Sequence, residues 1–382
     1  MLFLLVACEP KQNPFTERQC ASLGNTTISL VKVDSFKIEE PFEYEGPHDF
    51  YDCYNDKENK YIIQSGNNNN ILFYNITTRQ LEKVINPDDQ QPTAEKIGSI
   101  YVHNLDSIFF TDTYLADVFL IDGTGKLLQR WTFEYDATKF SDNAPAYRLY
   151  SSYQNLFYAP PELHLAVDHG QLLDFTTAKN WKNHRIYDVD TKTFKSSFGT
   201  LPPYYTYTKN SKHLDNFLVP TKIVEPQRIL ISYPLSHSIQ VYSKAGEFIE
   251  EKCAASTLID LLDAPLTVKE KQQEFLRFAA SPHYMNLSFH ADLNIYSRLV
   301  KRKYDIQNED GSLKSPLGIQ YTMILLDTEL NIIGEKPLDD YLYDWRFSLA
   351  TSDGYIVSSI GEKWLGKGYL IYNDQYKIII DQ

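Results

Sequence analysis

Three short stretches of the chain gather residue types that could bind a metal ion. His164, Asp168 and His169 lie together in LHLAVDHGQ, and on a strand His164 and Asp168 would share one face, whereas His169 would not. Two acidic groups offer the oxygen ligands that Ca²⁺ prefers: His48, Asp49, Asp52 and Asp56, and Asp339, Asp340 and Asp344. Neither group forms a regular D-x-D-x-D-G loop. The sequence therefore favours ordinary polar strand ends over a metal site and leaves calcium as the one cofactor candidate.

Aromatic residues in irregular segments are the better candidates for ligand contacts. Trp181, Tyr204, Tyr205 and Trp364 lie in such segments, where binding residues are more common than on the framework. Their rings, with nearby amides, suit the stacking and hydrogen bonding that bind sugars or peptides. Packing between strands is the competing interpretation for each of them. The sequence contains no G-x-S-x-G elbow, Gly-rich phosphate loop or H-E-x-x-H motif.

The N-terminus predicts export and lipid attachment. The chain begins MLFLLVAC, and the apolar run ends in Leu5-Val6-Ala7-Cys8, which resembles a bacterial lipobox. We expect residues 1–8 to be a lipoprotein signal peptide ending at Cys8, the lipid attachment site, and residues 9–26 to be a flexible tether. A core strand that begins the fold is the alternative. No other stretch approaches the roughly 20 apolar residues that span a bilayer.

Charge and cysteine content narrow the function further. The net charge is -13, whereas nucleic-acid binders are more often basic, so we expect no nucleic-acid partner. The four cysteines match no zinc spacing and are too few for a disulfide-dependent scaffold of 382 residues. If Cys8 carries lipid, three cysteines remain, and two of these could form one disulfide.

The elements that would position these residues follow from an internal repeat. Residues 107–130 (SIFFTDTYLADVFLIDGTGKLLQR) align without a gap with residues 228–251 (RILISYPLSHSIQVYSKAGEFIEE), and Gly125 meets Gly246. Each copy has apolar runs ten residues apart, which suits short strands joined by tight turns. Ile108, Val118 and Leu128 are the expected core positions. A repeated β meander of this kind predicts an all-β fold.

Six copies of this pattern predict a six-bladed β-propeller over residues 27–382, as a single domain. The others are 61–85, 163–194, 285–333 and 355–380, with insertions at 168–184 and 361–367. Seven blades are the alternative if the N-terminal strands form a unit of their own, although residues 27–38 could instead close the ring on the last blade. A capping box predicts one short helix over Thr267–Ala280, between blades four and five.

These features resemble a family of uncharacterised bacterial lipoproteins of about this length, grouped under a domain of unknown function, whose body is a TolB-like six-bladed propeller. The residues that carry the resemblance are the lipobox, the segment 229–247 and the segment 287–302 with its Tyr296-Ser297-Arg298 ending. The resemblance spans essentially the whole chain. It implies this fold and an envelope location, and it supplies no activity and no catalytic residues.

We therefore expect a lipid-anchored propeller of the bacterial cell envelope, on the outer membrane, facing the periplasm or the cell surface. Its expected role is to bind a small-molecule, glycan or protein ligand at the central channel or loop face. The candidate binding residues are Trp181, Tyr204, Tyr205, Tyr296, Arg298 and Trp364. The alternative is a propeller-type enzyme, a hydrolase, lyase or metal-dependent lactonase-like protein, with its site at the channel mouth.

Overall fold

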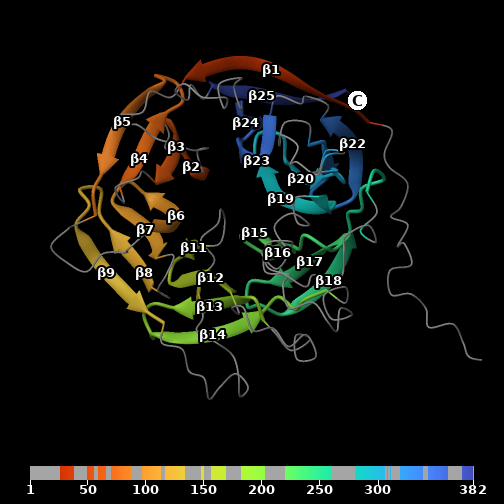
Figure 1. Cartoon of the computed structure of the whole chain (residues 1–382). Helices are drawn as coiled ribbons and strands as arrows, with labels where there is room; N and C mark the ends of the chain where they lie inside the picture. The colour runs from red at the N-terminus through yellow and green to blue at the C-terminus, as the bar shows by residue number, and fades with distance from the viewer. Residues whose placement is uncertain are drawn as a thin grey trace, which may run out of the picture.

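The chain forms six antiparallel β-sheets arranged as blades around a common axis (Figure 1). The computed structural model describes residues 26–37, 50–55, 59–65, 70–87, 97–112, 117–133, 148–149, 156–168, 182–202, 220–259, 261, 280–305, 308, 310, 319–338, 343–359 and 372–381. The predicted six-bladed all-β propeller is confirmed in this part of the chain.

In blades one to five the strands follow the chain from the axis outwards, and blade six takes its outermost strand from the N-terminal part of the chain, as Figure 1 shows. Blade one contains β2 (Phe50–Asn55), β3 (Lys60–Ser65), β4 (Ile71–Asn75) and β5 (Gln80–Ile85). Blade two contains β6 (Ile97–Asn104), β7 (Ser107–Asp112), β8 (Asp117–Ile121) and β9 (Leu127–Thr132). Blade three contains β10 (Arg148–Leu149), β11 (Leu156–Ala159), β12 (Glu162–Asp168), β13 (His184–Asp188) and β14 (Thr193–Phe198), and both β10 and β11 pair with β12.

The second half of the ring repeats this plan. Blade four contains β15 (Thr221–Val224), β16 (Arg228–Ser232), β17 (Ser238–Ser243) and β18 (Phe248–Cys253). Blade five contains β19 (His283–His290), β20 (Ile295–Lys301), β21 (Tyr321–Leu326) and β22 (Ile332–Leu338). Blade six contains β23 (Tyr343–Ala350), β24 (Gly354–Ser359) and β25 (Tyr372–Asp381), and its outermost strand is β1 (Thr27–Lys37).

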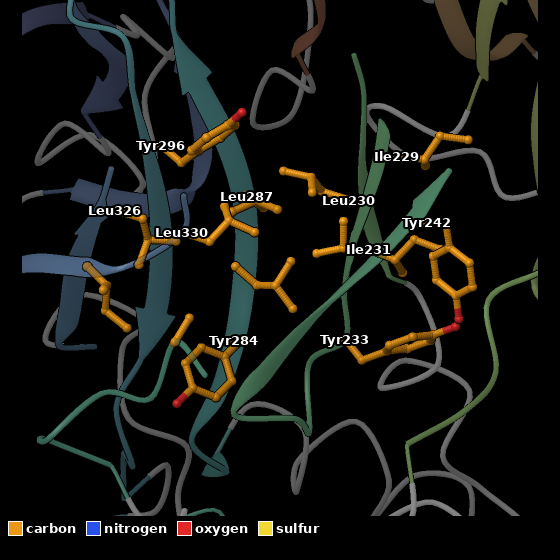
Figure 2. Packing of buried hydrophobic residues seen from close by; sticks show 14 of the residues in the cluster. Ile229, Leu230, Ile231, Tyr233, Tyr242, Tyr284, Leu287, Tyr296, Leu326 and Leu330 are labelled. Carbon is orange, nitrogen blue, oxygen red and sulfur yellow. The ribbon is translucent and has the colours of Figure 1, made fainter. Parts of the chain in front are cut away.

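The core lies between blades, because the middle strands are covered on both faces. All residues of β4, β20 and β21 are buried. Alternate residues of β16 face opposite neighbours, and Figure 2 shows Leu230 of blade four extending towards Leu287 of blade five. Strands buried on both faces carry continuous apolar runs instead of alternation, which explains the ILFYN and YTMILL segments.

The ring is closed by a strand from the other end of the chain. β1 pairs antiparallel with β25, from Thr27 opposite Asp381 to Lys37 opposite Tyr372. The expectation that the N-terminal strand closes the ring on the last blade is thus confirmed, and the seven-blade alternative is not supported. The described residues contain essentially no helix, so the predicted short helix is not supported either; nearly all of Thr267–Ala280 lies outside them.

The repeat from residue 107 to 130 belongs to blade two, as its place in the sequence predicts, but one of its expected core residues is exposed. Ile108 and Val118 are 0% exposed, whereas Leu128 is 48% exposed. The equivalent outer strand of blade four carries Phe248 and Ile249, at 56% and 54%. The assignment of Leu128 to the core was wrong because β9 is the outermost strand of its blade, where one strand face meets solvent.

Candidate functional site

Arg298 of β20 is a buried structural tie between blades four and five. Its side chain is 0% exposed, and its guanidinium carbon lies 3.5 Å from the ring centroid of Tyr284. The guanidinium donates hydrogen bonds to acceptors of blade four or the segment that follows it: Ser232 Oγ (3.0 Å) and the carbonyls of Tyr233 (3.3 Å), Ser236 (2.6 Å), His237 (3.2 Å) and Ala254 (3.0 Å). All five donors of the guanidinium fork point at protein acceptors, so its described contacts are those of a framework residue.

Tyr296 lies two positions earlier on β20 and belongs to the same seam. Its hydroxyl donates a hydrogen bond to Glu225, and Arg228 Nη2 lies 3.1 Å from its oxygen. Arg228 also donates to the carbonyl of Thr328 at 2.6 Å. Burial, then the hydrogen bond to Glu225, raises the pKa of Tyr296 to about 12, so the phenol stays protonated at neutral pH. The Tyr-x-Arg ending thus joins neighbouring blades.

The other predicted binding residues, Trp181, Tyr204, Tyr205 and Trp364, lie outside the described residues, and so does Cys8. Their positions in the sequence still show which strands are joined by the connections that contain them. Trp181 follows β12 and precedes β13, the two tyrosines follow β14 and precede β15, and Trp364 follows β24 and precedes β25. The strand ends that flank all three connections lie on the same side of the propeller, because neighbouring strands of a blade are antiparallel.

The two sides of the propeller differ in the length of their connections. On one side every connection between described strands has two to five residues; the first and second strands are joined by 56–59, 105–106, 160–161, 225–227, 291–294 and 351–353, and the third and fourth by 76–79, 122–126, 189–192, 244–247 and 327–331. The opposite side carries the long connections, including 38–49, 86–96, 133–147, 169–183, 199–220, 254–282, 302–320 and 360–371. We name these the tight-turn face and the long-loop face.

The seam between blades three and four holds a buried polar group. It contains His164, one of the predicted metal candidates, together with two residues that the sequence did not connect with it. His164 of β12 and His184 of β13 are each 1% exposed, and Lys222 of β15 is 3% exposed. Lys222 Nζ donates to the carbonyl of His164 at 3.0 Å. A lysine inside the short strand TKIV was the available sequence signal. The partner strand lies more than fifty residues earlier in the chain, so spacing alone could not join them.

Burial sets the protonation of this group. Desolvation lowers the pKa of His164 to about 3, with contributions from Lys222 and Lys244. Desolvation, Lys222 and His164 also lower the pKa of His184 well below its usual value. Desolvation lowers the pKa of Lys222 to about 7. At neutral pH both imidazoles are therefore neutral, and the amine lies close to its titration midpoint.

A second buried network joins blades five and six. His290 Nε2 lies 2.7 Å from Ser297 Oγ, His290 Nδ1 lies 2.8 Å from the carbonyl of Thr351, and Ser297 is also hydrogen-bonded to Tyr355. A serine beside a histidine oriented by a third group resembles the start of a nucleophilic site. His290, Ser297 and Tyr355 are nevertheless each 0% exposed, so the arrangement reads as a structural link between blades.

The predicted metal candidates fall mostly outside the described side chains. This applies to His48, Asp49, Asp52 and Asp56, to Asp168 and His169, and to Asp339, Asp340 and Asp344. Within the described ranges, no group of three or more histidine, cysteine or acidic residues is placed to hold a metal ion. In the same ranges no helix is long and apolar enough to cross a membrane.

Two of the four cysteines are described. Cys253, the last residue of β18, is disulfide-bonded, whereas Cys53 on β2 is not part of a disulfide. Cys8 and Cys20 lie outside the described residues.

Neither a protein-family model nor a curated protein sequence matches the chain. Among solved structures, a member of the DUF4221 family from Bacteroides vulgatus is similar, with a TM-score of 0.72 and 14% identity over 92% of this chain and 98% of that one. A "putative exported protein" from Bacteroides fragilis has a TM-score of 0.54 and 9% identity over 93% of this chain and 96% of its own. At these identities the likeness concerns the fold. The expected resemblance to a family of unknown function is confirmed at that level: the chain is a six-bladed propeller similar in fold to a DUF4221 family member.

Proposed function

We propose that this protein is a lipid-anchored propeller of the bacterial cell envelope that binds a small-molecule, glycan or protein ligand through its long-loop face. The observation that carries the proposal is the difference between the two faces. The connections on one face have two to five residues, whereas the long connections, which carry Trp181, Tyr204, Tyr205 and Trp364, join strand ends on the other face. Loops held by a rigid framework are the usual location of binding residues.

The place of the N-terminal strand supports the same arrangement. β1 begins at Thr27, opposite Asp381, at the tight-turn face, and ends at Lys37 at the long-loop face. A tether that precedes Thr27 would leave the propeller from the tight-turn face. A lipid on Cys8 would then hold that face towards the membrane and direct the long-loop face away from it.

Two observations support export. Cys253 is disulfide-bonded, and stable disulfides are typical of oxidising compartments such as the periplasm or cell surface. The Bacteroides fragilis structure with the same fold is described as exported. The alternative, a propeller-type enzyme, gains no specific support from the described side chains.

The anchor is tested by Cys8→Ala in the full chain. We expect the wild type in the membrane fraction and the variant in the soluble fraction, because a multiply acylated cysteine contributes about 0.8 kcal/mol for each buried methylene. Cys53→Ala is the matched control and should stay with the membrane. A variant that remains membrane-bound would exclude lipid attachment at Cys8.

The binding role is tested by tryptophan fluorescence. The chain has four tryptophans, and Trp131 and Trp345 are 8% and 2% exposed. Soluble glycans and short peptides that bind the long-loop face should change the fluorescence of Trp181 and Trp364, and the change should disappear in Trp181→Phe/Trp364→Phe. Equal affinity for the wild type and for a variant with alanine at Trp181, Tyr204, Tyr205 and Trp364 would contradict binding through these residues.

A further inference from the structure

The seam between blades three and four places two histidine side chains on one face of a sheet. The register pairs His164 with Ile186, and it pairs His184 with Ala166. His164 and His184 are therefore diagonal neighbours on adjacent strands, close enough to interact. Their register partners Ile186 and Phe198 pack against blade four, so both histidines lie on the sheet face towards that blade. The innermost strand of blade four contributes Lys222, which donates to the carbonyl of His164.

The ring nitrogens of both histidines retain their hydrogen-bonding capacity. None of the four nitrogens has a hydrogen-bond partner among the described residues, although both side chains are buried. A buried polar group without a partner costs about 1–3 kcal/mol, and native proteins nearly always satisfy such groups. A bound molecule that accepts hydrogen bonds would satisfy the N–H donor of each neutral imidazole.

The charged side chains around the two histidines indicate the charge of the molecule that would bind there. Each neutral imidazole supplies one N–H donor, and Lys222 supplies an ammonium group when it is protonated. Among the described side chains, Glu162 places its Oε2 3.7 Å from His164 Nε2 and is paired with Lys195, and Lys244 carries a charge that also lowers the pKa of His164. This balance of lysines favours an anion over a cation.

The walls of the seam limit the size of the molecule. The ring of Phe198 stacks on His184 with centroids 5.6 Å apart, and the ring of Phe157 packs edge-on against His164 at 5.9 Å. A Cβ added at Gly199 would lie 2.7 Å from His184 Nδ1, so the backbone already closes one side. A compact group with two acceptor oxygens fits this setting better than a phosphate, whose charge calls for more donors.

We propose that His164, His184 and Lys222 bind the carboxylate of a small organic acid at this seam. His184 begins β13 and Lys222 is the second residue of β15, so the site lies beside the connections 169–183 and 199–220 of the long-loop face. This inference deepens the proposed binding role by naming a ligand class for that face.

Binding is coupled to protonation of Lys222. A bound carboxylate favours the ammonium form, so it raises the pKa of Lys222 from its lowered value and draws in a proton. The affinity therefore falls as the pH rises above about 7, the region in which free Lys222 loses its proton.

The experiment is a titration of the full chain with sodium formate and sodium acetate at constant ionic strength, followed by thermal unfolding and calorimetry. We expect a saturable rise in Tm at pH 6.5 that is at least tenfold weaker in affinity at pH 8.5. The effect should be lost in Lys222→Met and in His184→Phe, each of which keeps side-chain volume in the seam. Lys377→Met, at the 46% exposed lysine of β25 in blade six, is the matched control and should bind like the wild type.

The outcomes separate the possible occupants. An equal effect of chloride, or one that persists in Lys222→Met, would overturn a carboxylate site. The absence of any saturable effect in the wild type would also overturn it and would indicate that water satisfies the histidines. Because no loop residue is changed, failure here would leave the fluorescence test of the long-loop face to be decided separately.

Discussion

At the scale of single residues, the positions that resembled binding residues and lie in the described structure are ties between blades. Arg298 donates to one hydroxyl and four backbone carbonyls, and Tyr296 bonds to Glu225. A sequence shows that a tyrosine and an arginine share a strand face, but it does not show whether that face meets a ligand or another blade. The candidate residues could therefore be picked out from the sequence, whereas their role in joining blades could not be predicted from it.

Arg298→Met should strongly destabilise the fold. The change removes the donors of several buried carbonyls, each of which then lacks a partner, so we expect a loss of about 3 kcal/mol or more in the free energy of unfolding, measured by urea denaturation. Arg79→Met is the control, because its ion pair with Asp34 is exposed and should contribute about 1 kcal/mol or less. Equal losses in the two variants would contradict a special role for Arg298.

Stability should fall as the pH falls from about 6.5 to about 4. Burial lowers the pKa of His290 from 6.5 to about 4 in the folded chain, and unfolding restores the higher value. The unfolded chain then binds more protons than the folded chain across this window, so acid favours unfolding. His164 and His184 act in the same direction.

His290→Gln separates this contribution from the rest. The variant should be less stable at pH 7, because the hydrogen bond to Ser297 is disturbed, but its stability should depend less steeply on pH between 6.5 and 4. Denaturant midpoints measured across this range test the expectation. An unchanged slope would show that His290 is not protonated on unfolding.

At the scale of elements, the blades repeat a turn that the ten-residue spacing only partly predicts. The third and fourth strands of five blades are joined by a turn with a residue at positive φ: Arg79, Gly125, Lys192, Gly246 and Leu330. The residue that begins each turn accepts backbone hydrogen bonds through its side chain: Asn75, Asp122, Asp188, Ser243 and Asp327. A bulge lies in the same strand pair of all five blades.

The aligned glycines were visible in the sequence, but the reason for them lies in the preceding blade. A Cβ at Gly125 would lie 2.0 Å from the carbonyl oxygen of Asn86, and one at Gly246 would lie 2.7 Å from Phe198. Both glycines thus touch the end of the preceding blade. The exposure of Leu128 was missed for a related reason. Apolar spacing does not show that a strand lies at the edge of its blade, and it does not show that a turn contacts the neighbouring blade.

Gly125→Ala should destabilise the propeller by about 2 kcal/mol or more. The backbone at this position has a φ of 91°, which disfavours a side chain, and the added methyl would meet Asn86. Thermal unfolding should show the loss. Lys126→Ala, in the same turn but exposed, should change stability by no more than about 0.5 kcal/mol, and a comparable effect of both changes would refute the steric argument.

At the scale of the whole molecule, the closing strand holds the ring together. Deletion of residues 1–37 should lower Tm sharply and promote association, because β25 would become an unpaired edge and Ile28 and Phe36 would leave buried positions. Deletion of residues 1–25 is the control and should keep Tm near that of the full chain. Both deletions are compared by size-exclusion chromatography and thermal unfolding in reducing buffer, so that the disulfide of Cys253 does not distinguish them. Similar behaviour of the two deletions would show that closure by β1 is dispensable.

Lipid attachment at Cys8, as proposed, would identify the disulfide partner of Cys253. Cys53 is not part of a disulfide and Cys253 is, so a thioether on the sulfur of Cys8 would leave Cys20 as the partner of Cys253. We expect mass spectrometry of a non-reduced digest of the envelope-derived protein to contain a Cys20–Cys253 peptide pair. A Cys8–Cys253 pair in that material would exclude lipid on the same cysteine.

The pairing of Thr27 with Asp381 closes the ring of blades and leaves one break in the covalent chain, between β25 and β1. This break lies where the other five blades have the turn between their third and fourth strands, and paired residues of adjacent strands are about 5 Å apart. A linker as long as the connection 122–126 could join Asp381 to Thr27 covalently. New termini within 244–247 would then give a circular permutant with all six blades in the same cyclic order. In such a permutant blade six would be covalently continuous, and blade four would be the one assembled from both ends of the chain.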